Sequence, residues 1–314
     1  MTRREFLAGS AALAAAGGSL TALAAEAPRG IRVRFLGSGA ASWKPEMAKN
    51  PHMRRQSSVL LDGRVLIDFT ACSFDHLPAG CRPEALFQTH SHGDHYNPVA
   101  AVKVGVKRLY VHETWAAAAR REVAAAAQAQ NLPAPEVIAL KFGVPVTEGD
   151  LRLTAVPANH STSRVTDGVL ERTSLYLVEK GPSRLLYATD TGGILGDAAR
   201  MIGIDAHISE KGFAGRYADN PFVAKPRPLT AFIMEATNGD IDDDFRVFVH
   251  SSVQTVSRIT SALKRTGRLV LPEGQHVYLT HLGLKYRGWA AERIDAELPP
   301  DLRAASDGLE LTLG

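Results

Sequence analysis

The stretch Thr89-His90-Ser91-His92-Gly93-Asp94-His95 decides most of what this sequence predicts. Alternate residues of an extended segment point the same way, so His90 and His92 can bind one metal ion. A turn after them can direct Asp94 and His95 toward a second ion. Imidazole and carboxylate ligands together suit zinc, with manganese or iron as alternatives. Three histidines and one aspartate at this spacing indicate a metal site rather than a chance cluster of surface histidines.

Three more polar residues stand where an apolar run ends. His160 follows the predicted strand Leu151–Val156, Asp190 ends the run that begins at Leu185, and His281 ends the run that begins at Val277. Side chains at the tips of strands emerge together at one edge of a sheet. Each of the three alone is a weak candidate for a metal ligand.

The pattern His-x-His-x-Asp-His, with these downstream residues, resembles the metallo-β-lactamase superfamily over residues 31–313. The resemblance implies an α/β fold, an αββα sandwich with a two-metal site at one edge of its sheets. It also implies a metal-bridged hydroxide as nucleophile, because two cations lower the pKa of a shared water. The implied ligands are His90, His92 and His160 for the first zinc ion, Asp94, His95 and His281 for the second, and Asp190 as the bridge. Asp94 counts as a catalytic residue as well.

Two later segments bear on the reaction. Glu235-Ala236-Thr237 and His250-Ser251-Ser252 resemble the phosphodiesterase branch of that superfamily, which includes ribonuclease Z and a cyclic-phosphate diesterase. The resemblance implies that His250 acts near the leaving group and that Glu235 assists it. The alternative is structural, with His250 at the start of a helix and Ser251 as its cap.

The chain departs from the ribonuclease pattern at Met234, where a histidine is usual. No long basic arm is visible, so we expect a small-molecule diester and no nucleic-acid partner. Arg55, in Arg54-Arg55-Gln56-Ser57-Ser58, and Lys211 are candidate substrate-binding residues because a cation there can contact a phosphate or carboxylate. Both can also be ordinary solvated loop residues.

Two other functions stay open. One is a zinc hydrolase of a lactone, ester or β-lactam, since an exported protein meets β-lactams. The other is a non-catalytic protein similar to the pyrroloquinoline-quinone biosynthesis B protein, which shares the early Leu-Gly-Ser and Arg-x-Ser-Ser features. That family often lacks part of the ligand set, whereas all seven ligands are present here.

The first 24 residues predict a twin-arginine-type signal peptide. Arg3-Arg4-Glu5-Phe6-Leu7 precedes an Ala/Leu/Gly run, and Ala22-Leu23-Ala24 is a small-x-small cleavage pattern. We therefore expect a periplasmic or secreted protein whose residues 25–314 form one hydrolase domain, with no stable membrane span after cleavage. Folding before export favours free thiols at Cys72 and Cys81, although a disulfide stays open.

Composition sets broad limits. The 314 residues are 45% hydrophobic and 22% charged, with a formal net charge of +3. This balance is typical of a globular protein with a large core and indicates no particular partner or oligomeric state. Helices are predicted at Glu113–Gln130 and Ser251–Lys264. Predicted strands are Ile31–Leu36, Ser58–Leu61, Val65–Phe69, Leu109–Val111, Leu151–Val156, Ser174–Val178, Arg184–Ala188, Ala231–Met234, Val277–Thr280 and Leu309–Leu313.

Overall fold

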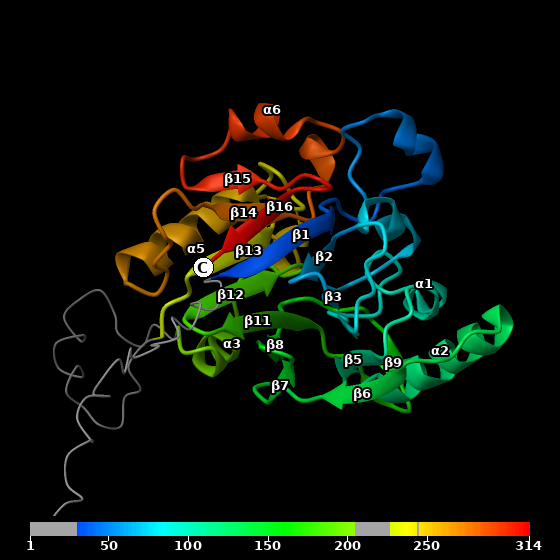
Figure 1. Cartoon of the computed structure of the whole chain (residues 1–314). Coiled ribbons are helices and arrows are strands. Elements are labelled where there is room, and N and C mark those ends of the chain that lie inside the picture. Colours follow the sequence, from blue (N-terminus) through cyan, green and yellow to red (C-terminus); the bar gives the residue numbers. More distant parts are fainter. Residues whose placement is uncertain (1–29, 205–226, 244) are drawn as a thin grey trace, which may run out of the picture.

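The computed structural model describes residues 30–204, 227–243 and 245–314. Two seven-stranded sheets pack face to face, and helices cover the outer face of each sheet (Figure 1). This is the predicted αββα sandwich. The predicted signal peptide and Lys211 lie outside the described residues.

The first sheet is built mainly from the amino-terminal half of the chain. Its order brings the last strand beside the first, so both ends of the described fold lie in one sheet. In spatial order the strands are β16 (Glu310–Leu313), β1 (Ile31–Gly37), β2 (Ser58–Leu61), β3 (Val65–Ile67), β4 (Ala85–Phe87), β5 (Arg108–His112) and β6 (Glu136–Leu140). The Asp62-Gly63 turn between β2 and β3 has positive φ at both residues, as a tight hairpin requires.

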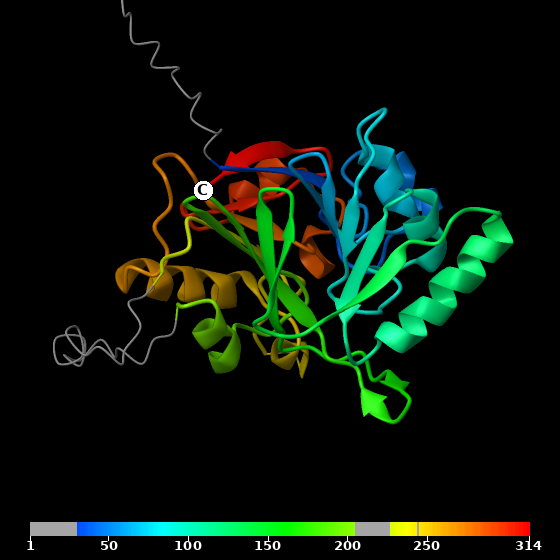
Figure 2. The same ribbon diagram turned by 60° about the horizontal axis from the view of Figure 1, so that its bottom comes forward.

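The second sheet is built from the carboxy-terminal half. Its strands in spatial order are β15 (Leu302–Ala304), β14 (Val277–Thr280), β13 (Ala231–Glu235), β12 (Ser183–Ala188), β11 (Ser174–Lys180), β8 (Leu151–Pro157) and β7 (Pro145–Glu148). A separate hairpin, β9 (Val165–Thr166) and β10 (Val169–Leu170), projects from the body below the sheets (Figure 2). The sequence analysis predicted no strand at β4, β6, β7 or β15. β4 and β15 have only three residues each, and the edge strands β6 and β7 are largely exposed.

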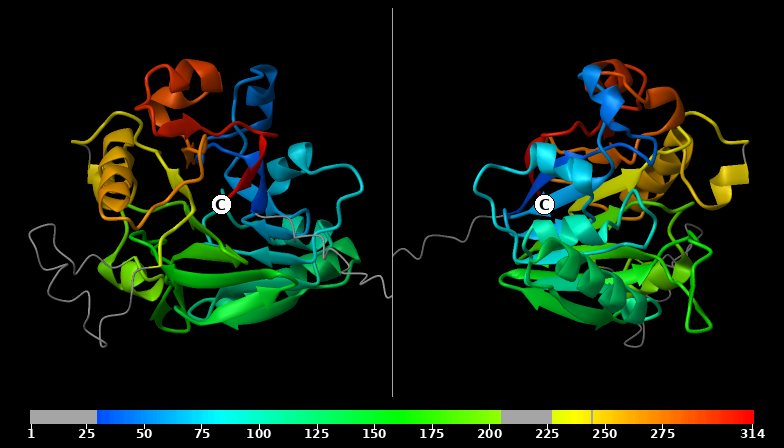
Figure 3. Two further views of the ribbon diagram at one scale, coloured as in Figure 1. Left: turned by 60° about the vertical axis from the view of Figure 1, so that its left-hand side comes forward. Right: turned by 90° about the vertical axis from the view of Figure 1, so that its right-hand side faces the viewer.

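Helices complete the two outer layers. The right-hand panel of Figure 3 looks onto α1 and α2 in front of the first sheet, while α3, α5 and α6 pack on the second. The bounds are α1 (Pro98–Lys103), α2 (Ala116–Gln130), α3 (Gly196–Met201), α5 (Val253–Arg265) and α6 (Ala291–Asp295), with 3₁₀ helices η1 (Pro45–Lys49), η2 (Ala71–His76), η3 (Phe245–Phe248) and η4 (Leu284–Tyr286).

Two predicted helix starts were wrong by a few residues. Before α2, Trp115 N–H donates to His112 O, so residues 113–115 form a turn and the helix begins at Ala116. Before α5, the cap is Ser252, whose side chain accepts from Thr255 N. Ser251 instead donates to Thr191 O, 2.7 Å away. The predicted cap at Ser251 is therefore corrected to its neighbour.

Each sheet is apolar on both faces, and β12 shows why its sequence lacks alternation. Leu185 and Tyr187 pack in the core between the sheets, whereas Leu186 and Ala188 pack against the helices. Successive side chains of a strand face opposite ways, so a strand covered on both sides is apolar throughout. The two buried faces hold the strand ends at fixed positions. No helix in the described parts of the chain is long and apolar enough to cross a membrane.

Candidate metal centre

Three site residues lie at the ends of three neighbouring parallel strands of the second sheet. Asp190 follows β12, Glu235 ends β13, and His281 follows β14. These strands pair in parallel register, with Met234 beside both Ala188 and Leu279. Since parallel strands end at the same edge of a sheet, the three side chains meet there.

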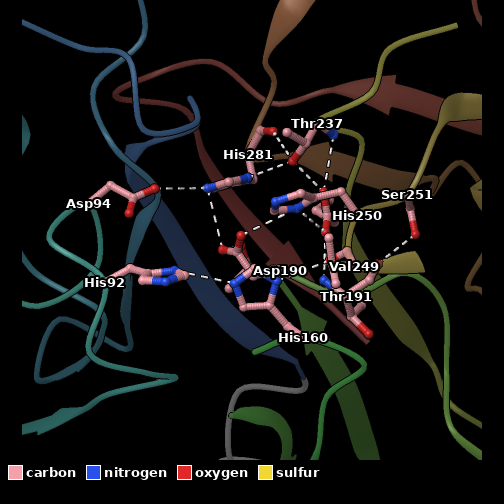
Figure 4. Close-up of polar contacts among 12 residues, drawn as sticks. His92, Asp94, His160, Asp190, Thr191, Thr237, Val249, His250, Ser251 and His281 are labelled. Carbon is pink, nitrogen blue, oxygen red and sulfur yellow. Dashed lines mark hydrogen bonds and ion pairs between the residues drawn. The ribbon is translucent and has the colours of Figure 1, made fainter. Parts of the chain in front are cut away.

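The first sheet contributes the other half of the site. The loop carrying His90, His92, Asp94 and His95 leaves β4, and it faces the strand ends of the second sheet (Figure 4). His160 completes the group from the end of β8. The structure thus brings together all seven residues that the sequence analysis grouped as ligands.

Backbone strain accompanies this arrangement. Asp190 has φ 47° and His281 has φ 49°, both in the left-handed backbone region that residues other than glycine rarely occupy. Such a conformation costs of the order of 1–3 kcal/mol per residue and persists only where the surroundings enforce it. Here it directs each side chain from a strand end toward the cluster.

The first cluster consists of His90, His92 and His160. His90 Nε2 lies 2.9 Å from His92 Nδ1, and His92 Nδ1 lies 3.3 Å from His160 Nε2. The three inward nitrogens lie within 4.8 Å of one another, as ligands of a single ion must. These are the three residues predicted for the first metal.

The second cluster consists of Asp94, His95 and His281, with Asp190 beside it. His281 Nε2 lies 3.3 Å from Asp94 Oδ2 and 3.2 Å from His95 Nε2. Asp190 Oδ2 lies 2.6 Å from His95 Nε2 and 3.3 Å from His281 Nε2. Asp190 also forms a ligand group with His90 and His95, which places it between the two clusters.

Outer hydrogen bonds fix which nitrogen of most of these histidines points inward. His95 Nδ1 lies 2.7 Å from Asp68 Oδ2, and His160 Nδ1 lies 3.2 Å from the Val249 carbonyl. Each of these acceptors receives a hydrogen bond from Nδ1–H, so Nε2 is the ring nitrogen directed toward the cluster.

Two threonines do the same for His90 and His281. Thr89 Oγ1 donates to Asp68 and therefore accepts from His90 Nδ1, 2.9 Å away. Thr237 Oγ1 donates to Glu235 and therefore accepts from His281 Nδ1, 2.6 Å away. His90 and His281 thus also direct Nε2 toward the cluster.

Several inward lone pairs consequently face one another at close range. Without a cation this arrangement is repulsive, and a divalent ion between the nitrogens relieves it. Neutral imidazoles with carboxylates are a donor set that zinc accepts. The residues present therefore fit two divalent ions.

The electrostatics of the two clusters differ. Burial lowers the pKa of His90, His92 and His160, with neighbouring histidines adding to the effect, so these imidazoles stay neutral. Burial also opposes charge on His95, but Asp190, Asp94 and Asp68 outweigh it and raise its pKa well above the usual range. Three carboxylates around one imidazole create a negative potential that favours a bound cation.

His250 and Glu235 lie together at the rim of the clusters. His250 Nδ1 is 3.0 Å from Glu235 Oε1 and 3.4 Å from Asp190 Oδ1. Burial lowers the pKa of His250, but the hydrogen bond and charge of Glu235 outweigh it and raise the pKa to about 9. Glu235 is fully buried and also binds the backbone N–H groups of Thr191 and Thr237.

Arg55 lies elsewhere. Its Nε and Nη2 donate to Asp75 Oδ2 at 3.0 and 2.9 Å, and its guanidinium lies over the Trp43 ring. None of the contacts described for this side chain involves the seven clustered residues. Its predicted role in substrate binding stays a prediction, as does that of Lys211, which lies outside the described residues.

Asp68 and Glu171 were missed by the sequence analysis. Asp68 is a buried carboxylate that holds both His95 and Thr89. Its signal was present as a single acidic residue ending the apolar run 65–67. Glu171, between the β9–β10 hairpin and β11, binds Ser91 inside the metal loop. No sequence pattern links residues 80 positions apart.

Comparison with known families agrees with this geometry. The family model described as beta-lactamase superfamily domain matches residues 66–267, which is more than half of the chain. No curated protein matches the chain significantly.

Solved structures show the same fold at low sequence identity. Zinc-bound PqqB from Methylobacterium extorquens is 19% identical with a TM-score of 0.57, covering 90% of this chain and 100% of that protein. The short form of human tRNase Z is 17% identical with a TM-score of 0.57, covering 90% and 99%. Unliganded yeast PDE1 is 11% identical with a TM-score of 0.53, covering 90% and 99%.

Proposed function

Because this chain belongs to the beta-lactamase superfamily, a family of metal-dependent hydrolases, we propose that it is a dinuclear zinc hydrolase of small phosphodiesters. The observation that carries the diester assignment is the contact between His250 Nδ1 and Glu235 Oε1, 3.0 Å, beside Asp190. It supplies a proton donor at the edge of the ligand clusters, where a leaving alkoxide needs one.

The chain's own residues divide the chemical work. Two divalent ions bound by the clusters would acidify a water for attack and offset negative charge on the phosphoryl oxygens. His250 Nε2 has no partner among the described residues, so it is free to donate a proton as the P–O bond to the leaving group breaks. Glu235 holds the other ring nitrogen and keeps the imidazole protonated near neutral pH. We therefore assign Glu235 as a positioning residue.

A hydrolase of lactones, esters or β-lactams is the second candidate. The observation that favours it is the engagement of Arg55 by Asp75, which removes one expected contact for a phosphate. A carboxylic substrate needs less cationic recognition and its reaction depends less on an acid at His250. The similarity to PqqB and to tRNase Z concerns the fold, so neither neighbour decides between these substrates.

A substrate panel tests the proposal. We expect zinc-loaded protein to hydrolyse a chromogenic phosphodiester, and chelation by excess EDTA to abolish turnover with recovery on adding zinc. A chromogenic lactam and a lactone run beside it under the same conditions. Turnover of the lactam or lactone alone would replace the diester proposal with the second candidate. Silence on all three with two bound zinc ions would favour a non-catalytic role.

Export is a separate part of the proposal and rests on residues 1–24. We expect the protein recovered from the periplasm or medium to begin at Ala25, because Ala22-Leu23-Ala24 fits the cleavage pattern. Mass spectrometry of the recovered protein measures this. Replacing Arg3 and Arg4 together by lysine should leave the full-length chain in the cytoplasm. An unprocessed parent protein found only in the cytoplasm would contradict export.

A further inference from the structure

His92 differs from the other four clustered histidines in how it is held. Hydrogen bonds to Thr89, Asp68, the Val249 carbonyl and Thr237 hold the outer nitrogens of His90, His95, His160 and His281. Within the described parts of the chain, no such partner is found for the outer nitrogen of His92. Its ring therefore lacks the support that normally fixes a metal-binding imidazole.

The backbone must supply that support, because His92 presents Nδ1 to the cluster. Nδ1 lies nearer the main chain than Nε2, which the other four histidines direct inward. A displacement of the main chain at residues 91–92 therefore moves Nδ1 by nearly the same amount. For His92, a contact that fixes the backbone position therefore also fixes the position of the metal-binding nitrogen.

Glu171 holds that backbone from the opposite side of the loop. Its Oε1 accepts from Ser91 N at 2.7 Å and its Oε2 accepts from Ser91 Oγ at 2.5 Å. Both carboxylate oxygens are thus used on one residue, which stands directly between His90 and His92. Glu171 is 3% exposed, so water does not compete effectively for these bonds.

Glu171 and its neighbours are themselves held by further hydrogen bonds and an ion pair. Its N–H donates to Arg164 O at 2.9 Å, which closes the base of the β9–β10 hairpin. Arg164 pairs with Glu122 of α2, and Thr173 Oγ1 donates to His160 O at 3.0 Å. The segment 171–173 therefore connects the metal loop to α2 and to the main chain of His160.

We infer that Glu171 is a positioning residue for the first metal site, holding Ser91 so that His92 Nδ1 converges with His90 and His160. The inference rests on the metal assignment in the proposed function. It makes the two sites unequal, because the site containing His92 depends on Glu171 directly, whereas the other is linked to it only through the bond from His95 N to His92 O. Removing a partner that orients a ligand typically weakens metal affinity by about 10- to 100-fold.

Zinc binding measured by chelator competition tests this without any substrate. The parent should bind two equivalents in two resolved steps, and His92→Ala identifies which step belongs to the first site. We expect Glu171→Gln to weaken that step by about 10- to 100-fold and to leave the other within about threefold. Ser91→Ala, which keeps the backbone N–H bond, should have a smaller effect on the same step.

Glu148→Gln is the matched control. Glu148 is also buried, but it binds Arg108 and Tyr110 away from the clusters. Thermal unfolding of the metal-free variants shows whether both glutamate variants remain folded. Unchanged affinities in Glu171→Gln, an equal loss at both steps, or the same loss in Glu148→Gln would overturn the inference. A parent that binds no zinc would instead contradict the proposed function, and this inference with it.

Discussion

Replacing His281 with alanine is expected to remove one zinc equivalent and to lower kcat/KM by about 10³-fold or more. His281 Nε2 lies within 3.3 Å of Asp94, His95 and Asp190, so its loss leaves the second site short of a ligand. A catalytic ion stabilises the transition state by several kcal/mol, which corresponds to a loss of this size. Metal content of the purified variant and steady-state rates at saturating zinc measure the two effects.

His112→Ala serves as the control for His281→Ala. His112 is a buried histidine on β5 that contacts Thr114 and Phe142 and belongs to none of the ligand groups. Its loss should reduce stability yet leave two zinc ions and the rate unchanged. An inactive His281→Ala protein that still holds two zinc ions would show that His281 acts other than as a ligand.

The fold class could be predicted from the sequence because the apolar runs that indicate buried strands are local features. Runs such as 185–188 within β12 are apolar at every position, which indicates a strand covered on both faces, and the structure places β12 between a sheet and a helix layer. The edge strands β6 and β7 lack this signal because several of their side chains are exposed. For β6 the pattern of exposed and buried residues is too irregular to distinguish it from a loop.

The candidate ligands were found from local features together with the family resemblance. Spacing within residues 89–95 and the polar ends of three apolar runs needed no tertiary information. The side chains that hold the ligands are different, because Asp68 meets His95 and Glu171 meets Ser91 only after the layers pack. The pairing of Arg55 with Asp75 was equally out of reach, since it depends on how η2 packs beside the loop before β2.

The cap of α5 shows how a one-residue shift changes an interpretation. The sequence offered His250 as a proton donor or as a helix-start residue capped by Ser251. With Ser252 as the cap, Ser251 is bound to the Thr191 carbonyl and His250 stands two residues before the cap. Its ring then meets Glu235 and Asp190, a geometry that helix capping alone does not require.

Replacing His250 with alanine is therefore expected to lower kcat/KM for a diester with an alkyl leaving group by about 10²- to 10⁴-fold. Both zinc ions should remain, since no predicted ligand is removed. The loss should be much smaller for an aryl diester, because a phenolate leaves without being protonated. Rates for the two substrates, with zinc content measured on the same samples, give the comparison.

The pH profile provides the second arm of the His250 test. An imidazole that must be protonated supports activity below its pKa and loses it as the pH rises through that value. Activity should therefore fall along an alkaline limb with a midpoint no higher than the raised pKa of about 9, since bound cations disfavour the imidazolium and lower this midpoint. The limb should disappear in His250→Ala. Ser252→Ala, which removes the helix cap at a cost of about 1 kcal/mol, should keep it. Equal losses for alkyl and aryl diesters, with the limb retained, would show that His250 holds the rim in place and donates no proton.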